Sequence, residues 1–153
     1  MTTPLARRAL LVAGTATAAG ALLHLAIPLG GPAWYAAFGA PPGLVELVRI
    51  GHPRAAITCV VIAAGLATLA AYAFSGAGIV RRLPLLRPAL ATIAGLLIAR
   101  GAGFLPLALW RPDLLARICD CRGVDAFLLV TSALCLAMGT AYALGARGLR
   151  ETA

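Results

Sequence analysis

Five ionisable side chains stand out in a chain that is otherwise strongly apolar. Arg100 lies near the middle of the apolar segment 89–110, and His24 lies inside an earlier apolar run. Asp125 opens a later run, while Glu46 and Arg49 are three residues apart in a short amphipathic stretch. A charged group in hydrocarbon costs a few kcal/mol unless it pairs, reaches water or lines a cavity. These five side chains are therefore the candidates for binding chemistry.

Arg100 permits two interpretations. It can bind an anion, a lipid headgroup or the carbonyl of a quinone-like molecule, or it can pair with Asp125 or Glu46 or snorkel to the surface. The small residues of its segment lie on the opposite helical face, so the guanidinium would face lipid if only that face packed. Gly101 and Pro106 loosen the helix just beyond it, which could admit water or redirect the side chain.

The other charged candidates have simpler structural explanations. For His24 we prefer a neutral hydrogen bond between helices to proton transfer or ligation. Glu46 and Arg49 fit a solvated ion pair on one helix better than a catalytic couple. We therefore predict ligand-binding residues but no catalytic residue, metal site or cofactor.

Two of the four cysteines are candidates for redox chemistry. Cys59 and Cys135 lie in apolar runs, where a thiol behaves as a small hydrophobic group. Cys119 and Cys121 form a Cys-x-Cys in a polar segment, which is a weaker redox motif than Cys-x-x-Cys. Neighbouring aspartates could join them around a metal, but the spacing for a closed tetrahedral site is missing.

Composition assigns the chain to the membrane proteins. Hydrophobic residues make up 61% of 153 residues, charged residues only 12%, and mean hydropathy is +0.94. A soluble domain is about one quarter charged. The net charge of +8 comes from 13 basic residues, all arginine, scattered in ones and twos, which argues against nucleic acid as a partner. The lack of lysine and the abundance of Ala, Gly and Leu indicate a GC-rich bacterial source.

The apolar runs predict an all-α bundle of four transmembrane helices in a single domain, residues 1–153. The predicted spans are approximately 9–29, 55–74, 89–109 and 124–144. The first could also be a cleaved signal peptide, but its apolar run continues far enough to span a bilayer. Between the first two spans, Trp34, Tyr35 and Phe38 have the composition of an interfacial aromatic belt, and Pro42–Ile50 predicts a short interfacial helix.

Arginine distribution predicts that both termini are cytoplasmic. Four spans place seven arginines on the side of the termini and five on the other side. We interpret the arginines of 79–87 as topology determinants, with binding of anionic headgroups as the alternative. In this orientation His24, Arg100 and Asp125 could converge in an outward-facing polar pocket, with Glu46 and Arg49 forming a lid.

The chain resembles the small four-span bacterial inner-membrane proteins of the DoxX-like type. The resemblance covers the span number, the length and the loop LGGPAWYAAFGAPPGLVELVRIGHP, in which an aromatic, Gly and Pro turn precedes a short helix. It implies an inner-membrane location and keeps open a quinone- or thiol-linked redox role using Cys119 and Cys121. The preferred expectation is a non-enzymatic module that binds membrane lipid, a small amphiphile or a partner protein.

Overall fold

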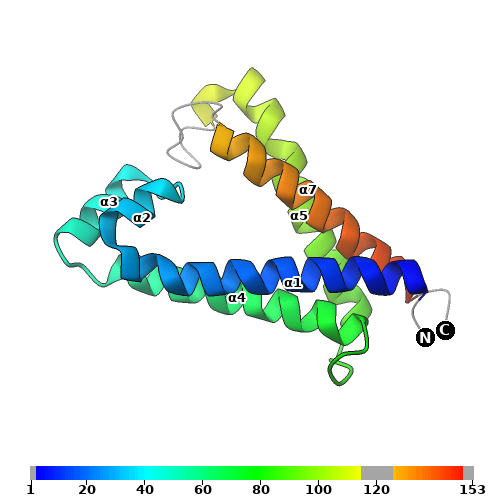
Figure 1. The fold of residues 1–153 in the computed structure, drawn as a ribbon. Helices are drawn as coiled ribbons and strands as arrows, with labels where there is room; N and C mark the ends of the chain where they lie inside the picture. The colour runs from blue at the N-terminus through cyan, green and yellow to red at the C-terminus, as the bar shows by residue number, and fades with distance from the viewer. Residues whose placement is uncertain (1–2, 115–125, 150–153) are drawn as a thin grey trace. The chain divides into compact units, whose positions relative to one another are not determined.

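The chain is helical throughout its described part. The computed structural model describes residues 3–114 and 126–149, and every regular element in these ranges is a helix (Figure 1). In chain order the elements are α1 (Pro4–Ala26), the 3-10 helix η1 (Ile27–Gly30), α2 (Gly31–Ala37), α3 (Pro42–Arg49), α4 (Arg54–Gly76), α5 (Leu86–Trp110) and α7 (Ala126–Gly148). The all-α prediction is confirmed for these residues.

Within residues 3–114 and 126–149, three segments are long and apolar enough to cross a membrane, which indicates a membrane protein. They are Pro4–Ala37, Arg54–Gly76 and Ala126–Gly148. Helix α5 covers the remaining predicted span and is 25 residues long. Helices form over the described residues of all four predicted spans, but a fourth crossing stays a prediction.

The helices extend past the apolar runs from which the spans were predicted. Helix α1 begins at Pro4 and includes Arg7 and Arg8, because proline is favoured at the first helical position. The backbone of 31–37, which we expected to be a loop, forms helix α2. A helix does form at Pro42–Arg49, while its place at a membrane interface stays a prediction.

The described residues group into two compact units, and helices α1 and α4 contribute to both. One unit comprises residues 1–16 and 69–153, and the other comprises 17–68. In the first unit the largest fully buried side chains are Leu10, Leu90 and Tyr142. The Tyr142 hydroxyl donates a hydrogen bond of 3.1 Å to the Leu69 carbonyl. This core therefore joins residues from α1, α4, α5 and α7.

Helices α5 and α7 pack closely because glycines remove side chains from their contact. A Cβ on Gly139 would lie 3.0 Å from the backbone nitrogen of Ile98, and one on Gly101 would lie 2.7 Å from the Ser132 carbonyl oxygen. Small residues at such positions let membrane helices approach backbone to backbone. Ser132 and Gly139, which lie seven residues apart on α7, are both buried.

The second unit has a smaller core around an aromatic ring. Tyr35 is only 2% exposed and clusters with Ile27, Ala55 and Cys59. The Cys59 thiol donates to the Tyr35 hydroxyl at 3.6 Å. The sequence placed Tyr35 in an interfacial belt together with Trp34, whose side chain is indeed 44% exposed. Tyr35 instead turns inward, because successive residues of a helix point in different directions.

A buried serine organises the turn after α4. Ser75 Oγ donates to the Arg81 carbonyl at 3.0 Å and accepts from the Leu83 amide at 2.9 Å. The helix ends at Gly76, and Gly78 adopts a φ of 75°, which favours glycine.

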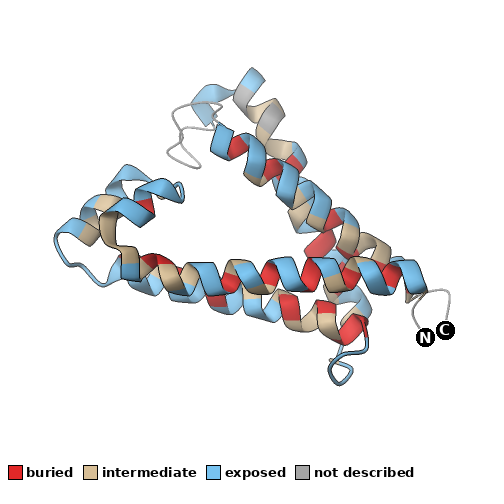
Figure 2. Cartoon of the chain, viewed as in Figure 1, coloured by how far each residue is buried: buried red, intermediate tan, exposed pale blue. Residues whose placement is uncertain are grey.

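Many large apolar side chains on the long helices are exposed (Figure 2). Examples are Val12 at 67%, Val61 at 65% and Leu134 at 56%. Large exposed apolar surfaces are rare on soluble monomers and mark contact with lipid or another protein. The exposure pattern therefore agrees with the membrane class indicated by helix length.

Candidate functional site

Arg100 is exposed on the middle of α5. It lies 14 residues after Leu86 and 10 before Trp110, which is roughly 21 and 15 Å from the two helix ends at about 1.5 Å per residue. Its guanidinium carbon lies 3.6 Å from the centroid of the Phe104 ring. Among the described residues it forms no ion pair with a carboxylate. The cation–π contact with Phe104 is a partner that the sequence analysis did not identify.

The packed face of α5 differs from the small-residue face considered in the sequence analysis. Ile93 and Leu97, which share the Arg100 face on helical spacing, are buried or packed against the core. Ala91 and Gly95, on the opposite face, are exposed. Packing therefore uses a mixed large and small surface, and Arg100 lies outside it.

His24 is half-buried and bonds within its own helix. Its Nδ1 lies 2.8 Å from the Gly20 carbonyl oxygen. A carbonyl only accepts, so Nδ1 carries the proton and a neutral ring leaves Nε2 as an acceptor. Ala13, Thr17 and Ala21 lie on the same face of α1 by helical spacing, and all three are buried. With a neutral ring, Nε2 of His24 is an acceptor at the edge of a buried helical face.

Glu46 and Arg49 are brought together on α3. Arg49 Nε lies 3.8 Å from Glu46 Oε2, and both side chains are 67% exposed. Both also line a pocket of about 360 Å³ between α2 and α3, together with Ala36, Ala40, Pro42 and Val45. An exposed pair of this kind contributes at most about 1 kcal/mol. The ion pair is therefore weak enough for the Glu46 carboxylate or the Arg49 guanidinium to bind a polar group that enters the pocket instead.

Three predicted chemical residues lie outside the described residues. They are Asp125, Cys119 and Cys121. Arg100 belongs to one compact unit and His24 to the other, so the predicted convergence of His24, Arg100 and Asp125 stays a prediction. In the described part of the chain, no group of three His, Cys, Asp or Glu side chains could hold a metal ion.

Two further charged arrangements were not identified from the sequence. Arg111 donates to Asp113 at 3.0 and 3.1 Å just after α5. These hydrogen bonds hold the pKa of Asp113 below its ordinary value. The spacing of two residues was visible in the sequence, but only the helix end at Trp110 makes both side chains converge.

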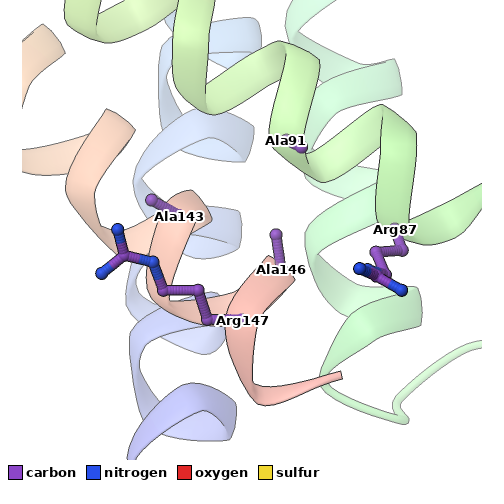
Figure 3. Close-up of a pocket in the computed structure, with 5 residues that line it drawn as sticks. All are labelled: Arg87, Ala91, Ala143, Ala146 and Arg147. Carbon is purple, nitrogen blue, oxygen red and sulfur yellow. The ribbon is translucent and has the colours of Figure 1, made fainter. Parts of the chain in front are cut away.

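The second arrangement is a basic pocket between the start of α5 and the end of α7. Arg87 and Arg147 line it, and Figure 3 shows them on either side of Ala146. Its volume is about 250 Å³. The two arginines are far apart in the sequence, so no local motif reveals the pairing.

Comparison with protein-family models, curated proteins and solved structures gives no match for this chain. The DoxX-like resemblance therefore stays a prediction, and the function must be argued from the site.

Proposed function

We propose that this chain is a small multi-pass membrane protein whose four long helices all cross the bilayer. Helix α5 has the length of a span. In the sequence it lies between α4 and α7, which are both long and apolar enough to be spans. The arginine bias favours cytoplasmic termini, and the all-arginine basic composition favours a bacterial inner membrane. In this arrangement α3 lies at the outer interface.

Its proposed function is non-enzymatic binding of an amphiphile, lipid or partner protein through an outward-facing polar site. Arg100 is the principal binding residue, His24 and Asp125 are its proposed neighbours, and Glu46 with Arg49 forms the lid. The observation that carries the proposal is the exposed guanidinium of Arg100 in the middle of an apolar helix.

An arginine in the middle of a membrane span costs free energy, and the contact with the Phe104 ring offsets part of that cost. Insertion scales assign about 2.5–3.5 kcal/mol to an arginine at the centre of a span. A cation–π contact returns about 0.5–2 kcal/mol, depending on desolvation. The Phe104 ring therefore leaves roughly 0.5–3 kcal/mol to be supplied by another group. A carboxylate, phosphate or carbonyl of a ligand or partner would supply it, because guanidinium forms strong charge-assisted hydrogen bonds with these acceptors.

Mass spectrometry of the gently purified protein tests the proposal. The wild type should carry a co-purifying molecule that Arg100→Leu loses and Arg100→Lys retains in part, since lysine keeps the charge but not the planar fork. Phe104→Leu is the matched control, because it changes the neighbour while leaving the charge. An empty wild-type protein would contradict the proposal.

A stability measurement separates binding from a structural ion pair. If Arg100 serves a ligand, the ligand-free Arg100→Leu protein should be at least as stable as the wild type, because a costly charge is gone. A fall of about 3 kcal/mol or more in the free energy of unfolding would instead indicate a buried pair that leaves its partner uncompensated.

A further inference from the structure

We propose that the basic pocket, defined as Arg87, Ala91, Ala143, Ala146 and Arg147, binds the phosphate of an anionic phospholipid headgroup. The two arginines extend from different helices, and Ala146 lies between them in the view of Figure 3. Helices α5 and α7 are packed directly against each other within one compact unit. The pocket is therefore held by a rigid helix pair and does not depend on a loop.

The charge of the pocket selects an anion. Both arginines are exposed, and among the described residues no carboxylate lines the pocket. The ion pairs in the described part of the chain involve Arg49 and Arg111 only. Arginine matches phosphate geometry with two parallel hydrogen bonds, so two arginines can hold one phosphate from both sides.

Arg7 provides a contrast within the same unit. Its Nε donates to the Ala77 carbonyl at 3.2 Å, so this arginine already contributes a hydrogen bond to the fold. Arg87 and Arg147 have no such bond among the described residues, which leaves their donors available for a ligand.

The position and floor of the pocket favour a lipid over a free anion. Arg147 lies in the last turn of α7, and a helix of 23 residues is about 34 Å long, close to the thickness of the hydrocarbon layer plus one headgroup region. The floor consists of alanine methyl groups. A free phosphate has no apolar part that could pack against them. The glycerol and upper acyl carbons of a phospholipid can cover them while the phosphate meets the arginines.

Native mass spectrometry of the protein in detergent, with phosphatidylglycerol or phosphatidylcholine added, tests this proposal. The wild type should retain phosphatidylglycerol preferentially, and Arg87→Gln with Arg147→Gln should weaken its retention about tenfold through loss of charge-assisted hydrogen bonds. The matched control is Arg81→Gln with Arg82→Gln, which removes the same charge from exposed positions outside the pocket. It should weaken retention by no more than about threefold, because solvated charges are screened.

Several outcomes would overturn the proposal. Equal losses in both double variants would indicate a diffuse surface charge, and unchanged retention in the pocket variant would exclude the site. Displacement of the lipid by excess inorganic phosphate would assign the pocket to a free anion. The double variant Arg87→Lys with Arg147→Lys should retain phosphatidylglycerol at an intermediate level, because it keeps both charges. Circular dichroism of each variant checks that a loss of retention does not result from misfolding.

This proposal is independent of the Arg100 site. Arg100→Leu should leave phosphatidylglycerol retention at the basic pocket unchanged, so failure of either proposal can be recognised separately.

Discussion

Replacing Gly139 with alanine tests the close approach of α5 and α7. A Cβ at this position would lie 3.0 Å from the backbone nitrogen of Ile98 and 3.1 Å from the Ala94 carbonyl oxygen. Ordinary contacts begin at about 3.4 Å, and backbone atoms cannot move aside by changing a rotamer. The helices must therefore separate by about 0.4 Å at this point, which loosens the contacts around it.

The expected cost follows from two opposing effects. Overpacking of a tight interface costs about 1–3 kcal/mol. Alanine favours the helix over glycine by about 1 kcal/mol. The net effect of Gly139→Ala should be a loss of up to about 2 kcal/mol in the free energy of unfolding.

Gly95→Ala is the matched control, because Gly95 lies on α5 with no atom within 4 Å of its added Cβ. It should be neutral or stabilising by up to about 1 kcal/mol through helix propensity alone. Both variants can be measured by titrating dodecyl sulfate into detergent micelles and following helical circular dichroism. If Gly139→Ala proved as stable as Gly95→Ala, the proposed backbone contact would be wrong.

Three further predictions concern the turn after α4, the end of α5 and the loop thiols. Ser75→Ala should lower the free energy of unfolding by about 1–3 kcal/mol, measured in the same titration, because it removes two part-buried hydrogen bonds, each of which contributes about 0.5–1.5 kcal/mol. The carboxyl of Asp113 should titrate below an ordinary aspartate in a carbon NMR titration. Any stabilisation from this lowered pKa is present above the ordinary value and is lost as pH falls through the lowered one, and Arg111→Gln should return the pKa toward normal. Alkylation of Cys119 and Cys121 should leave ligand retention unchanged in mass spectrometry, whereas its loss would favour the redox alternative.

The sequence alone predicted the helices and the membrane class. Long apolar runs must satisfy their backbone hydrogen bonds internally in lipid, so helices follow directly from run length. The apolar runs predicted four helices and the amphipathic stretch Pro42–Ile50 predicted a short one. The structure has a helix at each, over the described residues, and the short helix ends at Arg49. The sequence also located Arg100 and the pair Glu46 and Arg49, because a charged residue within an apolar stretch can be recognised from the order of the residues alone.

The tertiary structure alone decided which face of each helix packs. Lipid is as apolar as a protein core, so the outer and inner faces of a span carry similar residues and their periodicity is weak. For this reason the sequence did not show that Tyr35 turns inward or that Ile93 packs while Arg100 stays exposed. That Arg87 and Arg147 line one pocket depends in the same way on how α5 packs against α7, which the order of the residues alone does not show.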